Sequence, residues 1–361
     1  MRKNLFATTP GIIIVGAVIG LIAVWLQKLG NPANMGICVA CFERDVAGVL
    51  GLHRAAIVQY LRPEIMGLVL GSLAAAIATR EFKPRGGSAP IVRFVLGMIA
   101  AMGALVFLGC PWRAILRLAG GDGNAILGLA GLATGIWFGT LFFKKGYSLG
   151  RSNSQSVVSG ALFPVIAVCL LLLYLIFPQI PDQPQSGPLF YSVKGPGSQH
   201  APFIASLGLA FIIGIFAQRS RFCTMGAFRD LFLFRYTHLF LGLAAMFAAA
   251  FIANALTGGL KFGFEGQPVA HSDFLWNYLG MVTAGLAFAL AGGCPGRQLF
   301  MAGEGDSDAG IFALGMLVGA AMAHNLGTAS SGTGIGVYGM QATIIGFAVC
   351  LIIGFVHSKK A

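Results

Sequence analysis

The sequence has few charged side chains, and acidic ones are especially scarce. Charged residues make up 10% of the 361 positions, and only 12 are Asp or Glu; an ordinary soluble domain has roughly 25% charged residues. A GxxxxGK[ST] loop is missing, which argues against ATP hydrolysis by this chain. No second CxxC and no histidine cluster completes a zinc site. We therefore expect no metal, no other cofactor and no enzymatic activity.

What the sequence has instead is apolar surface and positive charge. Apolar residues make up 57% of the chain, and the formal net charge is +12. Such a charge could indicate a nucleic-acid partner. In a polytopic membrane protein, however, basic connectors set the orientation in the bilayer. We expect the lipid bilayer, and no nucleic acid, to be the partner of these residues.

Long apolar runs recur along the chain, and a membrane-spanning helix needs about 20 such residues. They predict ten spans, near 11–29, 62–79, 92–109, 124–143, 160–178, 201–218, 238–256, 274–292, 308–326 and 336–357. With the N-terminus inside, the cytoplasmic connectors hold most of the Lys and Arg residues. The prediction is a multi-pass protein of a bacterial inner membrane with both termini in the cytoplasm.

Two halves of the chain carry the same motifs in the same order. CVACFERD begins at Cys38, and CTMGAFRD begins at Cys223. Further on, GCPWR at 109–113 matches GCPGR at 293–297. An ordered set of matches at a nearly constant offset indicates an internal duplication.

The duplication defines the predicted architecture. We expect a first transmembrane repeat at 1–180, a periplasmic linker at 181–200 and a second repeat at 201–361. Five spans per half is an odd number, so the two copies enter the membrane from opposite sides and form an inverted repeat. The fold class is an all-α polytopic membrane protein with about ten transmembrane helices in two inverted five-helix repeats.

The motifs themselves read as re-entrant or broken helices. The cysteine-led segments are too short and too polar to cross a bilayer, and the Pro of each GCP turn breaks a helix. Such backbone is tolerated at membrane depth only where protein buries it or it lines a wet cavity. Because the two halves are inverted, their motif segments enter from opposite faces and meet near the middle of the membrane. The predicted pathway is lined by four thiols: Cys38, Cys110, Cys223 and Cys294.

Thiols are soft and polarizable, and they suit an anion with a terminal sulfur or selenium. Backbone N–H groups at broken helix ends add stabilisation for negative charge. Fixed positive charge at the mouths comes from four arginines: Arg44, Arg113, Arg229 and Arg297. The pattern therefore predicts transport of a small soft anion.

These motifs and the ten-span duplication resemble the YeeE/YedE family of sulfur-compound transporters, whose best-understood members import thiosulfate. The compact length and the CxxC at Cys38 and Cys41 look most like its selenium metabolism membrane protein YedE/FdhT branch. The resemblance implies that Cys110, Cys223 and Cys294, and Cys38 by the repeat, pass the ion along by S–H···S hydrogen bonds.

Two other functions remain open from the residues alone. Cys38 and Cys41 are a candidate redox pair for a membrane thiol-disulfide oxidoreductase, although Gly226 replaces Cys41 in the second half. Alternatively, Cys223 could carry a persulfide or selenium for a cytoplasmic sulfur- or selenium-transferase protein. His324, which with Asn325 lies deep inside a predicted span, is either a hydrogen-bonded core histidine or a candidate proton relay.

Overall fold

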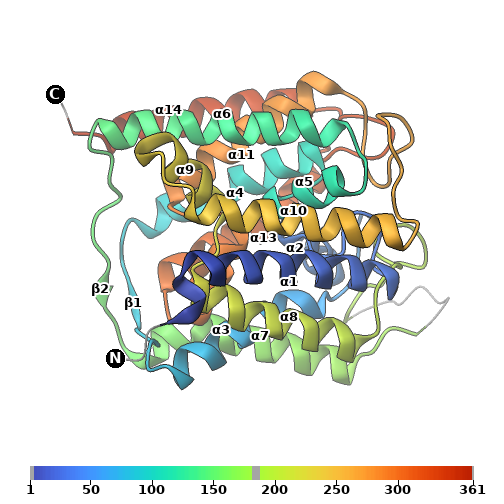
Figure 1. Cartoon of the computed structure of the whole chain (residues 1–361), viewed down its shortest axis with the longest axis horizontal. Coiled ribbons are helices and arrows are strands. Elements are labelled where there is room, and N and C mark those ends of the chain that lie inside the picture. Colours follow the sequence, from blue (N-terminus) through green and yellow to red (C-terminus); the bar gives the residue numbers. More distant parts are fainter. Residues whose placement is uncertain (1–3, 181–187, 360–361) are drawn as a thin grey trace.

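The computed structural model describes residues 4–180 and 188–359. These residues form a bundle of long helices that run in roughly one direction (Figure 1). The helices are η1 (Leu5–Ala7), α1 (Thr9–Lys28), α2 (Val39–Val49), α3 (Pro63–Ala78), α4 (Pro90–Phe107), α5 (Pro111–Ala119), α6 (Asn124–Lys144), α7 (Val157–Ile176), α8 (Phe203–Ser220), α9 (Thr224–Phe234), α10 (His238–Leu256), α11 (Phe274–Ala291), α12 (Pro295–Gly303), α13 (Ser307–Asn325) and α14 (Gly339–Val356). Two-residue strands β1 (Arg85–Gly86) and β2 (Asn153–Ser154) pair antiparallel.

Each of the ten predicted spans is a helix, which confirms the all-α polytopic class. Within the described residues, nine helical segments are long and apolar enough to cross a membrane. The tenth, α3, is apolar but has only 16 residues. Its start is set by Pro63, whose missing N–H costs nothing in the first turn of a helix.

The two halves pack against each other in exchanged pairs. Helix α6 lies along α11, while its counterpart α13 lies along α4; likewise α3 packs on α8 and α10 on α1. Glycines make this possible. A Cβ at Gly135 would collide with the backbone oxygen of Val282 on α11, and one at Gly315 would collide with that of Phe94 on α4. Small residues let helix backbones approach closely, as the GxxxG spacings predict.

A connector of each half likewise packs against a short helix of the other half. The backbone N–H of Lys83 donates to the oxygen of Glu304 over 2.9 Å, and that of Lys261 donates to the oxygen of Gly120 over 2.9 Å. The end of α12 therefore meets the connector after α3, and the end of α5 meets the connector after α10. Figure 1 shows β1 at one end of the bundle and the loop after α10 at the other. The two short helices run outward to opposite ends, as expected for halves related by inversion.

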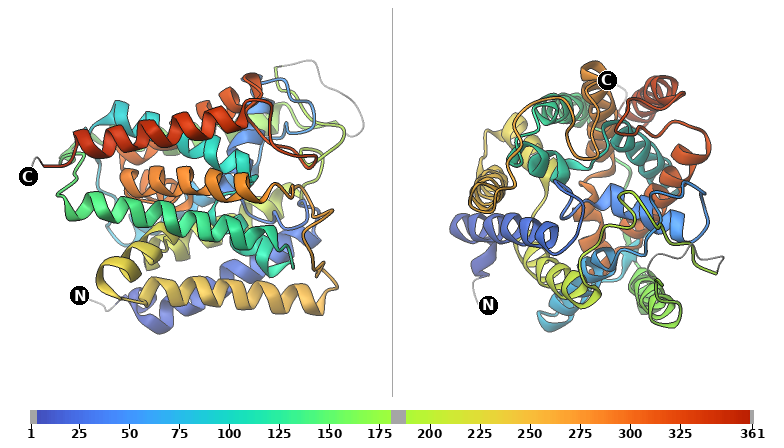
Figure 2. Two further views of the ribbon diagram at one scale, coloured as in Figure 1. Left: turned by 90° about the horizontal axis from the view of Figure 1, so that it is seen from above. Right: turned by 90° about the vertical axis from the view of Figure 1, so that its right-hand side faces the viewer.

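The outer helices depart from this pairing. Helix α7 packs against α3, whereas its counterpart α14 lies against α11 and α4 (Figure 2). Helix α1 begins and α14 ends at the same end of the bundle (Figure 1).

The predicted linker falls partly on 181–187, which lie outside the described residues. Its remainder is packed rather than free: the N–H of Phe190 donates to the oxygen of Val49 over 2.9 Å, and Ser192 accepts from the N–H of Gln59 over 2.8 Å.

Candidate functional site

Four short helices begin with a cysteine at the N-cap position. Cys38 precedes α2, Cys110 precedes α5, Cys223 precedes α9 and Cys294 precedes α12. A cysteine at this position is in extended backbone and leaves the free N–H groups of the first turn around its thiol. The four predicted pathway residues therefore share one local geometry.

The GCP turns break two longer helices as predicted. Helix α4 is followed by Leu108, which has a left-handed φ of 64°, and α11 is followed by Gly292 with a φ of 87°. One residue of extended backbone follows the turn, and then Pro111 or Pro295 starts the next helix. Proline fixes the φ of a first helical residue and cannot continue the helix before it.

In the first half, the starts of α2 and α5 meet. The Sγ of Cys38 accepts two backbone N–H groups, from Cys41 of its own helix and from Cys110 across the gap, each over 3.4 Å. The Cys110 thiol in turn interacts with the N–H groups of Arg113 and Ala40. We call Cys38 and Cys110 the first thiol pair.

The second half repeats this arrangement. The Sγ of Cys223 accepts the N–H of Gly226 over 3.3 Å and interacts with both the thiol and the backbone N–H of Cys294. The Cys294 thiol interacts with the N–H groups of Arg297 and Thr224. Cys223 and Cys294 form the second thiol pair.

All four thiols are free and buried. Cys223 is the most accessible at 6% of its surface, and the other three have 1% or less. Each pair lies where two helix N-termini converge, and the helix dipole makes these ends positive. Thiols beside positive helix ends suit a soft anion. The backbone N–H groups that donate to these thiols have only sulfur, a weak acceptor, as their partner.

Arg113 brings a full positive charge to the first thiol pair. Its side chain is fully buried, and its Nη1 donates to the Sγ of Cys41 over 3.4 Å. Backbone oxygens hold the rest of the guanidinium, including those of Leu108 and Val269. Among the described residues it forms no ion pair with a carboxylate, and its predicted role in attracting the anion stays a prediction.

The other three predicted arginines lie in ion pairs with carboxylates. Arg44 bonds the buried Asp45 over 2.7 Å, and Arg229 bonds Asp230 over 2.8 Å at a half-exposed position. Arg297 bonds Glu304 over 3.2 Å. Their predicted role in attracting the anion stays a prediction. Glu304, which also holds Arg221 over 2.7 Å, was not found by sequence reasoning because it has no acidic counterpart in the first half.

An aromatic cluster joins the segments that carry the two thiol pairs. Trp112, two residues after Cys110, packs its ring 5.8 Å from that of Phe222, the residue before Cys223. It lies 5.9 Å from the ring of Phe300. The same indole covers Gly296, two residues after Cys294. Trp112, Phe222 and Phe300 form what we call the aromatic junction, and sequence reasoning did not single out any of them.

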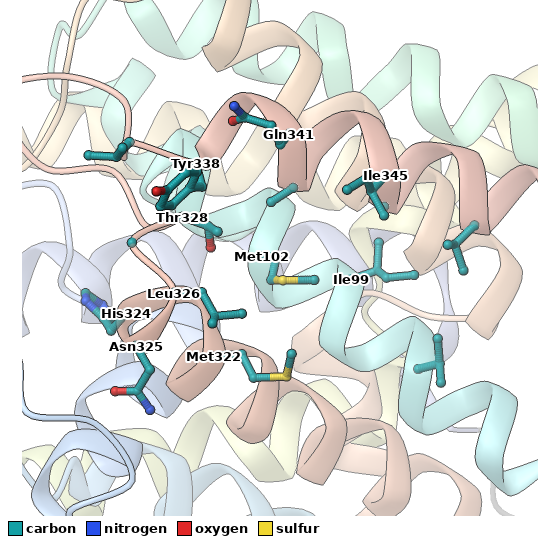
Figure 3. Close-up of a pocket in the computed structure, with 16 residues that line it drawn as sticks. Ile99, Met102, Met322, His324, Asn325, Leu326, Thr328, Tyr338, Gln341 and Ile345 are labelled. Carbon is teal, nitrogen blue, oxygen red and sulfur yellow. The ribbon is translucent and has the colours of Figure 1, made fainter.

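His324 lies away from the thiols. Helix α13 ends at Asn325, so the prediction that His324 lies deep inside a span was wrong: it is in the last helical turn. Its ring stacks on that of His53 at 4.5 Å and borders a largely apolar cavity of about 900 Å³ between α4, α13 and α14 (Figure 3). Its proposed part in proton relay is untested.

The described residues contain no group of three or more His, Cys, Asp or Glu that could hold a metal ion. Cys41 adds a thiol to the first pair but no further ligand. The fold and the site together define a duplicated, polytopic α-helical membrane protein with thiols at the meeting of broken helices.

Comparison with known proteins finds similarity over part of the chain. A model described as sulphur transport matches residues 219–354, which include the second thiol pair. The thiosulfate transporter TsuA of Spirochaeta thermophila is 32% identical over 106 residues, or 29% of this chain and 32% of that protein. The match thus spans about a third of the relative's length. Both findings show similarity to sulfur-transport proteins over part of the chain.

Proposed function

We propose that this protein transports a small sulfur- or selenium-containing anion into the cytoplasm through the bacterial inner membrane, with thiosulfate as the first substrate to test. The observation that carries the proposal is the repeated meeting of two helix N-termini at a pair of buried thiols. A transporter needs sites that bind weakly enough to release, and thiols beside partial helix charges meet that need better than a full ion pair.

The chemistry of the site selects the anion class. A hard oxyanion gains most from strong hydrogen-bond donors and from arginine forks, yet three of the four arginines are already paired with carboxylates. A terminal sulfur or selenium is a soft, weak acceptor that a thiol S–H can match. The matched thiosulfate transporter of Spirochaeta thermophila supports the same class.

The thiol-disulfide oxidoreductase alternative is less well supported. Disulfide exchange needs a thiol that a soluble partner can reach, and Cys38 and Cys41 are both fully buried. The persulfide-donor alternative retains one supporting observation, since Cys223 is the most accessible of the four pathway thiols. Mass spectrometry that finds no added sulfur or selenium on Cys223 argues against it.

Uptake by purified protein in liposomes tests the proposal. Labelled thiosulfate, selenite and sulfate are compared with the unsubstituted protein and with Cys294→Ala. Faster entry of thiosulfate or selenite than of sulfate, lost in Cys294→Ala, is the expected result. Equal entry of all three, or entry of none, contradicts a soft-anion transporter.

A further inference from the structure

The two halves differ at the position that follows each GCP sequence. GCPWR has Trp112 where GCPGR has Gly296, and the two positions touch. A Cβ built on Gly296 would lie 3.1 Å from the indole ring of Trp112, closer than packed carbon atoms normally sit. A large residue in one half thus fills the space that its counterpart in the other half leaves open.

This placement puts Trp112 between the two thiol pairs. On one side it is two residues from Cys110 in the first turn of α5. On the other it packs against Phe222 and Gly296, which neighbour Cys223 and Cys294 in the chain. Trp112 therefore contacts residues that neighbour the second thiol pair while it lies beside a thiol of the first.

The indole N–H is not satisfied. Trp112 is only 1% exposed, and its Nε1 has no hydrogen-bond partner among the residues that the structure describes. An indole can only donate, and a buried donor without an acceptor is costly. Tryptophan N–H groups normally find a partner when buried, so an acceptor that visits the site would remove that cost.

A second unsatisfied donor lies next to the second thiol pair in the chain. The hydroxyl of Thr224, directly after Cys223 in the chain, is fully buried and has no partner within the described residues. The backbone N–H of this residue already interacts with the Cys294 thiol. Each thiol pair therefore has an unsatisfied donor within two residues of one of its cysteines, which a purely structural packing cluster does not require.

We propose that Trp112 is the internal gate of the pathway: its ring closes the junction between the thiol pairs, and its N–H, helped by the Thr224 hydroxyl, binds the anion as it passes. This inference rests on the proposed transport of a soft anion. It assigns the oxygen end of that anion to the two hydrogen-bond donors, while the soft sulfur or selenium faces the thiols. It also predicts a single central barrier, because only one of the two halves carries the indole.

Trp112→Phe tests the donor without opening the junction, since phenylalanine keeps an aromatic ring there. Thiosulfate uptake in liposomes is expected to fall about tenfold, the effect of losing one hydrogen bond to a charged group. Thr224→Val, which removes only the hydroxyl, is expected to act in the same direction. The matched control is Trp137→Phe, a tryptophan that is 45% exposed on α6, with uptake unchanged within about twofold. Normal uptake by Trp112→Phe would overturn the donor role.

Trp112→Ala tests the gate. Removing the ring is expected to let sulfate leak through liposomes that the unsubstituted protein keeps closed to it. Liposomes that stay tight to sulfate, with correctly folded protein, would overturn the gate. If the alanine variant does not fold, Trp112→Leu is used to open the junction in the same way.

A binding measurement separates this inference from the proposed function. Thiosulfate is titrated into protein labelled with ¹⁵N at the tryptophan indoles, with the Trp112 signal assigned by its loss in Trp112→Phe. A saturable shift of that signal supports the inference even if no transport is seen. Transport without a shift overturns the anion-binding role of Trp112 and leaves the proposed function intact. Neither transport nor a shift overturns both.

Discussion

The backbone N–H of Cys110 donates to the Sγ of Cys38 over 3.4 Å, so the starts of α5 and α2 meet at a sulfur atom. Cys223 and Cys294 repeat this relationship in the second half. Because the partial positive charge of a helix N-terminus falls off within its first turn, only groups at this meeting point feel two such charges at once. The proposed transport function depends on this meeting of two helix N-termini at a thiol.

Replacing one thiol of either pair is expected to abolish uptake without loss of folded protein. In Cys110→Ala the backbone N–H groups of Arg113 and Ala40 lose the sulfur atom that accepts from them. The anion loses a contact with a soft thiol. Cys223→Ala is expected to behave in the same way. Uptake of labelled thiosulfate in liposomes is the measurement.

Cys169→Ala is the matched control for the thiol variants. This cysteine is exposed on α7 and belongs to neither pair, so uptake should be unchanged. Normal uptake by all of the pair variants would rule out a thiol-lined path.

Asp45→Asn is expected to destabilise the protein strongly. Asp45 is fully buried between two arginines, 2.7 Å from Arg44 and 2.7 Å from Arg62. Removing its charge leaves buried cations without a partner, at a cost of about 3–5 kcal/mol. Unfolding of the detergent-solubilised protein measures this loss in the free energy of unfolding.

The repeat supplies the comparison for that variant. Asp230 occupies the equivalent position but pairs with an arginine that is 37% exposed, where ion pairs contribute about 0–1 kcal/mol. Asp230→Asn should therefore cost much less. Equal losses in the two variants would show that the buried network is not what stabilises the first half.

Gly135→Ala is expected to lower stability by about 1–3 kcal/mol, the usual range for overpacking. The added Cβ meets the backbone oxygen of Val282, so α6 and α11 must separate. Thermal unfolding checks the loss. Gly208→Ala in α8 is the control, because nothing lies within 4 Å of its Cβ position, and the more helical alanine should stabilise it by about 0.5–1 kcal/mol. A loss in both variants would mean that close packing is not the cause.

Acid should weaken the ion pairs at the end of α3. Burial raises the pKa of Glu81, but the hydrogen bond from Gln218 and the charges of Arg219 and Arg221 outweigh it, so this pKa lies below its ordinary value. A lowered folded-state pKa contributes stability above the unfolded-state pKa, and this is lost as the pH falls through the folded-state value. The melting temperature should fall on acidification below about 4.5, and less steeply in Glu81→Gln. Equal slopes would show that Glu81 contributes nothing.

The sequence was sufficient to predict the helices and the short cysteine-led segments. Apolar runs of bilayer length and the prolines of the GCP turns are local signals, and each has one physical meaning in lipid. The duplication then predicted which segments correspond, including the thiols of Cys38 and Cys223.

Contacts between distant residues could not be predicted in this way. Trp112 has a local sequence like any interfacial tryptophan, and its role depends on Gly296, which comes near only through the exchanged packing of the two halves. The pairing of Asp45 with Arg62 likewise depends on how the chain returns after α2. The predicted span 308–326 matched the end of α13 at Asn325, so His324 already lay near the end of that span rather than deep inside it.

The most direct test locates the anion in the protein. Crystals soaked with selenosulfate, in which selenium replaces the terminal sulfur of thiosulfate, would be measured at the selenium absorption edge. The account predicts anomalous density beside Cys38 and Cys110 or beside Cys223 and Cys294. Selenium bound only away from both thiol pairs would contradict it.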